Sequence, residues 1–290
     1  MACGKKLAII AGGGPLPLSV ACHAQASGRD VFIITLDGFT NCDFSTFDRR
    51  GFRITQANAI FNTIKKENCK EVVLIGTVHR PKRWRMDVGI SLFFLTLKNL
   101  NFMWDIAALA YRPNTGDATL LSKIIQGFEL QGLKVLGAHE VAPHLNLPVG
   151  TITRSKPSSR DHDDIVIGLR AVRTLGELDI GQCVVVVGGR VIAVEAAEGT
   201  DQMLKRSMSL NSSSSNKLQG ILIKWPQPIQ DLRIDMPTIG LRTIINVHEA
   251  GLAGVVYAGE NVLGVDICKM TEFANRHGLF ITGLKCSTPC

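Results

Sequence analysis

The sequence predicts an α/β protein with two α/β domains joined by a linker, the N-terminal one Rossmann-like. Short aliphatic runs alternate with segments of helical length, as in proteins whose strands are connected by helices. A glycine-rich turn follows the first aliphatic run, as at the start of a doubly wound sheet. Near the middle of the chain, prolines and glycines interrupt the alternation and predict a domain boundary.

The composition is that of a globular protein with a basic surface. Hydrophobic residues make up 46% of the 290 residues and charged residues 20%, which allows a sizeable core. The net charge of +7 favours phosphate-bearing or other anionic partners. Aromatic residues are only 6% and do not alternate with basic ones, so we do not expect a nucleic-acid partner.

Residues 1–140 are predicted to form the Rossmann-like domain. Apolar runs of strand length lie at residues 6–11, 31–36, 71–75 and 134–136. Helical patterns lie at residues 18–27, 57–68 and 118–131. In such a sheet the loops after the strands meet at one edge, where open α/β sheets bind their ligands.

Residues 141–159 are predicted to be a linker region and residues 160–290 a C-terminal α/β catalytic domain. The linker contains Pro143, Pro148, Gly150 and Pro157, which interrupt regular structure. Helices are expected at residues 161–178, 202–208, 243–250 and 269–276. Strands are expected at 183–187, 191–196, 218–224, 254–257 and 279–283, with Gly188 and Gly189 forming a hairpin turn.

The sequence predicts a cytoplasmic protein without a membrane span. The first apolar run is too short for an export signal. The most apolar segment, residues 88–110, contains only ten uninterrupted apolar residues, about half of what a spanning helix needs. The eight cysteines contain no C-x-x-C pair, and most lie in apolar surroundings, which favours buried free thiols over disulfides or zinc.

Gly12, Gly13 and Gly14 form the loop between the first strand and the first helix. Glycines let a backbone approach an anion closely, and a helix start offers free N–H groups. However, Leu16 and Pro17 depart from the G-x-G-x-x-G fingerprint, the phosphate-loop lysine is missing, and the nearest acid for a ribose is Asp37. A nucleotide-binding loop and a tight turn without ligand are both compatible with this pattern.

Two other predicted strand ends carry polar residues. Gly76 and Thr77 follow the third strand, and a basic cluster at residues 80–85 comes next. That cluster is either a solvated loop or an attractor for a phosphorylated substrate. Gly137, His139 and Glu140 follow the fourth strand, where they either stabilise the fold or contribute to a ligand-binding site.

Glu195, Glu198, Asp201 and Asp235 are four acids within a short part of an otherwise basic chain. Magnesium prefers such oxygen ligands and leaves its remaining positions to water and substrate phosphate. The structural alternative is that Thr200 caps a helix with Asp201 in its first turn. If residues 232–236 are extended, Arg233 and Asp235 share one face, which suits phosphate chemistry or, alternatively, a surface ion pair.

Five motifs that occur in order along the chain resemble those of the LpxI family, UDP-2,3-diacylglucosamine pyrophosphatases of lipid A biosynthesis. The likeness runs from about residue 6 to 283, and departures occur at residues 80–85 and 155–157. The motifs are Ala11-Gly12-Gly13-Gly14-x-Leu16-Pro17, Gly137-Ala138-His139-Glu140, Asp179-Ile180-Gly181-Gln182, Glu195-x-x-Glu198-Gly199-Thr200-Asp201-x-Met203-Leu204 and Asp235-x-Pro237-Thr238-Ile239-Gly240.

The resemblance implies a hydrolase of phosphoric anhydrides with its active site between the two domains. It implies Mg²⁺-dependent cleavage of UDP-2,3-diacylglucosamine to UMP and 2,3-diacylglucosamine 1-phosphate (lipid X), with water attacking the sugar-side phosphorus. It places Asp235 at the family's essential aspartate position, as metal ligand, water-orienting group or proton acceptor. The chemistry agrees, because pyrophosphate cleavage needs charge neutralisation and a positioned water.

The site expected from these arguments has a metal-binding part and a substrate-binding part. The expected metal ligands are Asp235, Glu195, Glu198 and Asp201. The expected substrate contacts are Gly12, Gly13, Gly14, Leu16, Pro17, Gly76, Thr77, Gly137, His139, Glu140, Gly199, Thr200, Arg233, Thr238 and Gly240.

Three further expectations concern partners and alternatives. Two acyl chains on the substrate imply peripheral contact with the inner face of the cytoplasmic membrane, with apolar residues 88–102 as a place for the chains. A homodimer is also predicted. The alternative functions are a nicotinamide- or flavin-dependent oxidoreductase, suggested by the opening glycine loop, and a non-catalytic module that binds nucleotide sugars.

Overall fold

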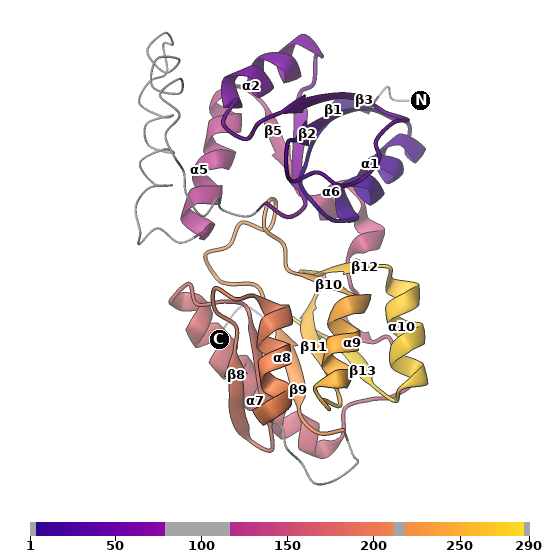
Figure 1. Ribbon diagram of the computed structural model, residues 1–290, viewed down its shortest axis with the longest axis vertical. Coiled ribbons are helices and arrows are strands. Elements are labelled where there is room, and N and C mark those ends of the chain that lie inside the picture. The colour runs from indigo at the N-terminus through magenta and orange to yellow at the C-terminus, as the bar shows by residue number, and fades with distance from the viewer. Residues whose placement is uncertain (1–3, 79–116, 211–217, 287–290) are drawn as a thin grey trace. The chain divides into compact units, whose positions relative to one another are not determined.

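The computed structural model describes residues 4–78, 117–210 and 218–286 (Figure 1). Contacts divide the chain into two units. Unit 1 comprises Met1–Pro143 with Arg233–Asp235, and unit 2 comprises His144–Leu232 with Met236–Cys290. The short segment Arg233–Asp235 therefore belongs by its contacts to unit 1, although the residues on both sides of it belong to unit 2.

Unit 1 contains a fully parallel sheet of five strands in the order β3-β2-β1-β4-β5. The strands are β1 (Gly4–Ala11), β2 (Arg29–Leu36), β3 (Asp48–Phe52), β4 (Glu71–Ile75) and β5 (Lys134–Leu136). This order confirms the Rossmann-like prediction. Strand β3 was not predicted from the sequence, because four of its five residues are exposed and only Phe52 is buried, so it shows no apolar alternation.

Helices cover both faces of this sheet (Figure 1). Helices α2 (Ala57–Lys66) and α5 (Asp117–Leu130) pack on one face, where Ile60, Ile64 and Phe128 join a buried cluster with strand residues such as Ile10 and Ile34. Helices α1 (Leu16–Ala26) and α6 (Ala138–Val141) lie against the other face. The one-turn helix α6 follows the end of β5, and no element was predicted there from the sequence.

Unit 2 contains a mixed sheet of six strands in the order β6-β13-β11-β9-β7-β8. Strands β9, β11 and β13 are parallel, whereas β6, β7 and β8 each pair antiparallel. Gly188 and Gly189, at φ 57° and 79°, close the β7–β8 hairpin as predicted. The strands are β6 (Gly150–Thr151), β7 (Cys183–Val187), β8 (Arg190–Val194), β9 (Ile221–Lys224), β11 (Gly254–Gly259) and β13 (Phe280–Lys285).

A second, two-stranded parallel sheet in unit 2 pairs β10 (Thr238–Gly240) with β12 (Leu263–Val265). The sequence analysis missed both strands, which are three residues each and too short to show periodicity. This small sheet positions the end of the predicted Asp235 motif, because Thr238 pairs with Leu263 and Gly240 pairs with Val265.

Four helices complete unit 2: α7 (Ser159–Glu177), α8 (Thr200–Leu210), α9 (Leu241–Glu249) and α10 (Ile267–Arg276). Helix α7 covers one face of the sheet, and the other three helices cover the opposite face (Figure 1). Helix α7 begins with a capping box in which Ser158 and Asp161 accept hydrogen bonds from each other's backbone N–H. The division of the chain between the two units falls within a single turn of 3₁₀-helix, Pro143–Leu145.

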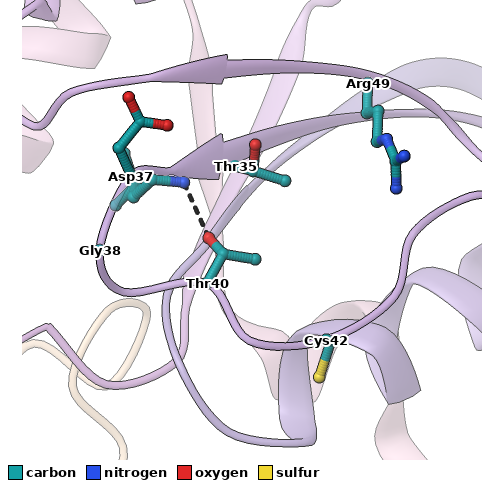
Figure 2. Close-up of a pocket in the computed structure, with 7 residues that line it drawn as sticks. Thr35, Asp37, Gly38, Thr40, Cys42 and Arg49 are labelled. Atoms are coloured by element: carbon teal, nitrogen blue, oxygen red, sulfur yellow. Dashed lines mark hydrogen bonds between the residues drawn. The ribbon is translucent and has the colours of Figure 1, made fainter.

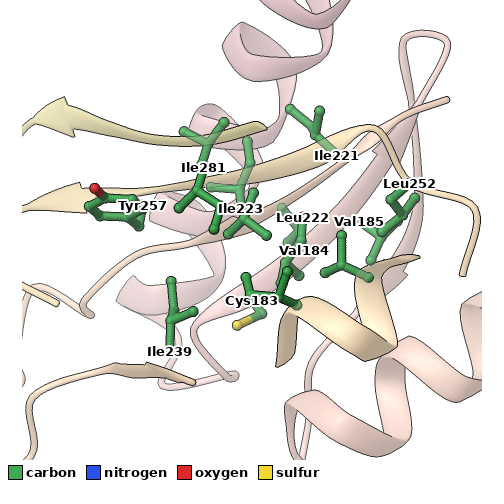
Figure 3. Close-up of a cluster of buried hydrophobic side chains, with 14 of the residues drawn as sticks. Cys183, Val184, Val185, Ile221, Leu222, Ile223, Ile239, Leu252, Tyr257 and Ile281 are labelled. Atoms are coloured by element: carbon green, nitrogen blue, oxygen red, sulfur yellow. The ribbon is translucent and has the colours of Figure 1, made fainter. Parts of the chain in front are cut away.

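The core of unit 2 is formed by aliphatic side chains of the central strands (Figure 3). Val184, Ile223 and Ile281 are fully buried there. Tyr257 is also fully buried, and its hydroxyl donates to the Pro148 carbonyl oxygen at 2.9 Å. Burial raises the pKa of Tyr257, so this residue acts as a packing group with one satisfied polar atom.

The cysteine prediction was partly wrong. All six cysteines within residues 4–78, 117–210 and 218–286 are free thiols, as expected, but only Cys69 and Cys183 are buried. Cys22, Cys268 and Cys286 are exposed and Cys42 is half-buried. An apolar neighbourhood in the sequence does not reveal which side of a helix faces the sheet, and Cys22 lies on the outer side of α1.

None of the helices in the described ranges is long and apolar enough to cross a membrane. The apolar segment at residues 88–110, the basic cluster at residues 80–85 and most of the serine-rich segment at residues 210–216 lie outside the described residues.

Candidate active site

The carboxyl ends of β1 and β4 are joined through the glycine loop, defined as residues 12–14. The Gly12 N–H donates to the Ile75 carbonyl at 2.8 Å, and Gly13 and Thr77 exchange two backbone hydrogen bonds of 2.9 Å. The Gly14 N–H donates to Asn41 Oδ1 at 2.9 Å. All three glycine N–H groups therefore bind acceptors within the protein, unlike those of a loop that holds a phosphate.

Glycine is required here because the two strand ends touch. A Cβ at Gly12 would lie 2.7 Å from the Gly76 carbonyl carbon, and a Cβ at Gly76 would lie 2.8 Å from that of Gly12. The predicted contacts Gly12, Gly13, Gly76 and Thr77 are thus brought together at one edge of the sheet. Helix α1 follows with Leu16 and Pro17, but Pro17 has no N–H to offer an anion.

Gly137 and His139 lie at the same edge, at the carboxyl end of β5. A Cβ on Gly137 would lie 2.3 Å from His139 Cε1, so the imidazole covers the glycine. The Nδ1 atom of His139 is buried and has no hydrogen-bond partner among the residues that the structure describes. Glu140, in contrast, is exposed. Because α6 contacts both β4 and α1, these residues belong to the same face of unit 1 as the glycine loop.

In unit 2, Glu195 is a buried carboxylate with two protein donors. Its Oε1 accepts from the Thr200 hydroxyl at 2.7 Å, and its Oε2 accepts from the Gln182 N–H at 3.1 Å. The buried Lys224 ammonium donates to the same Thr200 hydroxyl at 3.1 Å. Thr200 therefore connects a buried acid to a buried base, as buried charges require.

Cys183 lies next to this network, with its Sγ 3.6 Å from Thr200 Oγ1. Burial raises the pKa of the Cys183 thiol strongly, so it stays protonated and acts as a small apolar group. Gly199 precedes α8 at φ 79°, a backbone conformation that favours glycine. Gly199 thus provides the backbone conformation before the helix, and Thr200 provides the hydroxyl of the buried network.

Glu198 and Asp201 also have protein partners. Glu198 Oε1 accepts from Arg206 Nη2 at 2.9 Å, and its own backbone N–H together with Arg206 lowers the pKa of Glu198. Asp201 Oδ1 accepts from Asn246 Nδ2 at 2.9 Å, and its Oδ2 pairs with Arg242 Nε at 3.0 Å. Asp201 lies in the first turn of α8, where a carboxylate is favoured by the helix dipole.

The predicted four-acid metal site stays a prediction. Among residues 4–78, 117–210 and 218–286, no group of three or more His, Cys, Asp and Glu side chains is arranged to hold a metal ion. Glu195, Glu198 and Asp201 each accept a hydrogen bond from a donor of their own unit. Asp235 belongs by its contacts to unit 1.

The segment around Asp235 is a turn and not the extended strand that the sequence suggested. Residues 232–234 form the turn, and regular strand structure begins only at Thr238. Ile234 packs against the hydrophobic cluster of unit 1, and Arg233 Nη1 donates to Glu129 Oε1 at 2.8 Å. The packing of Ile234 in unit 1 and the bond from Arg233 to Glu129, which is distant in sequence, decide the conformation of this segment. The local alternation of polar and apolar residues does not.

Thr238 and Gly240, the other predicted contacts of this segment, lie in β10, and Gly240 caps the N-terminus of α9. Asp235 is half-buried, three residues before this strand. The motif Asp-x-Pro-Thr-Ile-Gly therefore consists of a half-buried acid followed by a short strand and a helix start.

A pocket that was not predicted from the sequence lies at the carboxyl end of β2 (Figure 2). Its volume is about 310 Å³, and it is lined by Thr35, Leu36, Asp37, Gly38, Thr40, Cys42 and Arg49. Asp37 was noted only as the nearest acid to the glycine loop, and Arg49 was overlooked because it lies in the missed strand β3. The position of Asp37 directly after an aliphatic strand was the available signal.

The fold and these strand ends define a two-domain α/β protein with a Rossmann-like N-terminal domain. The family model of the LpxI N-terminal domain matches residues 6–145, and that of the LpxI C-terminal domain matches residues 148–282. The chain belongs to the LpxI family, which confirms the resemblance seen in its motifs. It is 35% identical over 283 residues to UDP-2,3-diacylglucosamine pyrophosphatase LpxI of Caulobacter vibrioides, covering 97% of this chain and 98% of that protein.

Proposed function

We propose that the protein is a hydrolase that cleaves the pyrophosphate bond of UDP-2,3-diacylglucosamine in lipid A biosynthesis. The products are UMP and 2,3-diacylglucosamine 1-phosphate. The observation that carries this proposal is the 35% identity, over 97% of this chain, to the pyrophosphatase of Caulobacter vibrioides. Family matches to both units support it, because the whole two-unit architecture is shared.

In the proposed reaction a water oxygen bonds to the sugar-side phosphorus, and the bond from that phosphorus to the bridging oxygen breaks. UMP leaves with the bridging oxygen, and the sugar 1-phosphate carries the oxygen from water. We assign Asp235 to this water, as the group that orients it and accepts its proton. Its half-buried position supports the assignment, because a carboxylate there is partly shielded from solvent and still accessible to substrate.

We propose Mg²⁺ as the cofactor, with Asp235 as its carboxylate ligand and substrate phosphate and water as the others. Magnesium commonly binds proteins through one or two carboxylates, so a single acid fits this group better than a cage of four. When bound, the ion neutralises the negative charge that develops on the pyrophosphate. The proposed ligand set leaves out Glu195, Glu198 and Asp201, which accept hydrogen bonds from Thr200, Arg206 and Asn246.

The experiment is to incubate purified protein with UDP-2,3-diacylglucosamine, with Mg²⁺ or with EDTA, and to measure UMP. We expect UMP release that requires the metal. In ¹⁸O-labelled water, the label should appear in 2,3-diacylglucosamine 1-phosphate and not in UMP. Absence of UMP from the wild-type protein would refute the proposed function, and label in UMP would refute the attack at the sugar-side phosphorus.

The alternative of a dinucleotide-dependent oxidoreductase is disfavoured by the glycine loop. Its three N–H groups bind Ile75, Thr77 and Asn41, and so they are not available to a pyrophosphate. The alternative of a non-catalytic binding module differs from the proposal in one respect. It predicts binding of the nucleotide sugar without any release of UMP.

We further propose that the protein meets its substrate at the inner face of the cytoplasmic membrane. The two acyl chains of the substrate keep it in the bilayer, and the net charge of +7 favours an anionic membrane surface. Sedimentation with vesicles that contain anionic lipids tests this contact, and recovery of the protein in the supernatant at low salt would refute it. The homodimer stays a prediction, which a monomer mass by light scattering would refute.

A further inference from the structure

The pocket at the carboxyl end of β2, called here the β2 pocket, has no role in the reaction as proposed so far. It lies beside the glycine loop, because Cys42 Sγ donates to the Gly14 carbonyl oxygen at 3.0 Å. The carboxyl ends of parallel strands are where open α/β sheets bind ligands. Its volume of about 310 Å³ falls at the lower end of the range of small-molecule sites.

The backbone that carries Asp37 is firmly held. The Asp37 N–H donates to the Phe52 carbonyl at 2.9 Å, and the Phe39 and Thr40 N–H groups donate to the Leu36 carbonyl at 3.0 Å. The Thr40 hydroxyl accepts from the Leu36 N–H at 2.8 Å (Figure 2) and donates to the Ala11 carbonyl, which attaches the turn to β1. A carboxylate on such a turn is positioned before any ligand arrives.

The Asp37 side chain itself is exposed. No residue in the described part of the chain forms an ion pair or a side-chain hydrogen bond with its carboxylate. An ionised carboxylate only accepts hydrogen bonds, so the ligand that it recognises has to supply donors. Hydroxyl groups are such donors, and bonds between hydroxyls and a charged acceptor are stronger than neutral ones.

Gly51 of β3 keeps the space beside these oxygens open. A Cβ on Gly51 would lie 3.3 Å from Thr35 Oγ1 and 3.4 Å from Asp37 Oδ1. Gly51 pairs in regular register with Thr35, so β-sheet geometry does not demand a glycine at this position. A glycine in a strand interior often marks a site where a ligand approaches closely, and here it lies beside two oxygens that can bind hydroxyls.

Arg49 adds a positive charge on the same face. It is two residues before Gly51 in β3, so the two residues face the same side of the strand. Its Nη1 lies 3.6 Å from Asp43 Oδ1, and both side chains are largely exposed, so this ion pair is weak and exchanges readily for a phosphate. The β2 pocket thus offers hydroxyl acceptors and a phosphate-binding guanidinium.

We propose that the β2 pocket binds the nucleotide half of the substrate, with Asp37 accepting hydrogen bonds from the 2′- and 3′-hydroxyls of the ribose and Arg49 contacting a phosphate. This inference rests on the proposed function. In a 2,3-diacylated glucosamine, positions 2 and 3 carry acyl groups, so the free vicinal hydroxyls of the substrate are those of the ribose. A carboxylate that binds a vicinal diol therefore selects the ribose.

The test uses UMP and 2′-deoxy-UMP as probes in calorimetric titrations of the full-length protein. We expect the wild type to bind UMP about 10-fold more tightly than the deoxy compound, the usual effect of one charged hydrogen bond. Asp37→Ala should weaken UMP binding about 10-fold to 100-fold and reduce the preference for UMP to about 2-fold or less. An unchanged preference in Asp37→Ala would overturn the inference.

Two further variants control for charge and folding. Asp48→Ala removes the same charge from an exposed position of β3 outside the pocket, and it should bind UMP like the wild type. Gly51→Ala adds one methyl group beside Thr35 Oγ1 and Asp37 Oδ1, and it should weaken UMP binding with little change in the melting temperature. UMP binding by Gly51→Ala equal to that of the wild type would count against the pocket.

The kinetic readout separates this inference from the proposed function. With UDP-2,3-diacylglucosamine, Asp37→Ala should raise KM about 10-fold and leave kcat within about 3-fold, because the lost contact is to the ribose and not to the reacting phosphorus. No UMP from the wild type refutes the function itself, whereas wild-type UMP release with an unchanged KM in Asp37→Ala refutes only the ribose site. If Asp37→Ala weakened binding of 2,3-diacylglucosamine 1-phosphate instead of UMP, the pocket would hold the sugar half and the inference would be overturned.

Discussion

The glycine loop of unit 1 and the acidic loop of unit 2, defined as residues 195–201, occupy equivalent places. Each follows a strand and leads into a helix, and each carries residue types that are typical of ligand sites. Each also uses its polar groups within its own unit. The glycine loop is held by backbone N–H groups that donate to the neighbouring strand end and to Asn41, whereas the acidic loop is held by its carboxylates.

The two loops are therefore sensitive to different substitutions. In the glycine loop the limiting quantity is space, because a Cβ at Gly12 would lie within 2.7 Å of the backbone at Gly76. In the acidic loop the limiting quantity is charge, because the Glu195 carboxylate compensates the positive charge of Lys224 in a buried network. Neither loop needs a ligand to satisfy its polar groups. Asp235 is the acid to test for catalysis, because the motif resemblance places it at the family's essential aspartate position.

The largest expected effect is that of Asp235→Ala on turnover. If neither loop carries the chemistry, this substitution should lower kcat about 10³-fold, the typical loss of a group that handles the attacking water. The KM for UDP-2,3-diacylglucosamine should change little, because the contacts of the nucleotide and acyl chains remain. UMP release under saturating substrate measures kcat and KM separately.

The matched control is Asp163→Ala, which removes an exposed carboxylate from α7. It should have wild-type kcat and melting temperature. Wild-type turnover by Asp235→Ala would show that the catalytic acid lies elsewhere, and the acidic loop would then become the first place to search. A large loss of folding in Asp235→Ala would instead assign this residue a structural role.

The next largest effect is that of Glu195→Ala on stability. Removing this carboxylate leaves the Gln182 N–H without its acceptor and the Lys224 ammonium without nearby compensation, which should cost about 3–4 kcal/mol of unfolding free energy. Denaturant unfolding measures the loss. Glu198→Ala, which removes only an exposed partner of Arg206, should unfold like the wild type. Equal stability of the two variants would contradict the structural role of Glu195.

In the glycine loop, Gly12→Ala should destabilise unit 1 by about 2–3 kcal/mol. The added methyl group has to displace the backbone at Gly76 and Thr77, and overpacking against backbone is poorly accommodated. Gly14→Ala meets no atom within 4 Å and should cost about 1 kcal/mol, the strain of its positive φ. Hydrogen exchange at β1 and β4 reports the loss locally, and equal protection in both variants would contradict the close approach of the strand ends.

The smallest expected effect is a difference between the two units in how their stability depends on pH. The backbone hydrogen bonds of the glycine loop do not titrate, whereas unit 2 holds His248, whose Nδ1 is buried without a partner in the described residues. Burial, together with His277 at a ring distance of 4.3 Å, lowers the pKa of His248. The unfolded chain then binds a proton more readily than the folded one, so the unfolding free energy falls as the pH drops below about 6.5 toward the folded pKa.

His248→Phe should remove that part of the acid sensitivity, because phenylalanine keeps the ring contacts and cannot titrate. Urea unfolding midpoints at pH 7.5 and pH 5.5 provide the comparison. The wild type should lose more stability between the two pH values than the variant. An identical loss in both proteins would show that His248 is not responsible.

Most of the fold was predictable because strands and helices that bury one face leave a local pattern. The aliphatic run of β1, the helical periodicity of α7 and the glycine pair after β7 each contain their signal within a few residues. The ordered motifs were also sufficient to identify the family. Strand β3 escaped because an exposed edge strand such as Asp48–Phe52 has no apolar pattern to read.

The α/β class, the order of the main elements and the family can all be read from the sequence. Tertiary structure alone decided which polar groups have partners: Gly14 with Asn41, Glu195 with Thr200, and Arg233 with Glu129, 104 residues away. The physical reason is that periodicity reports which face of an element is buried, whereas a hydrogen bond depends on what the rest of the chain brings to that face. A carboxylate's role is set by that neighbour, and only folding supplies it.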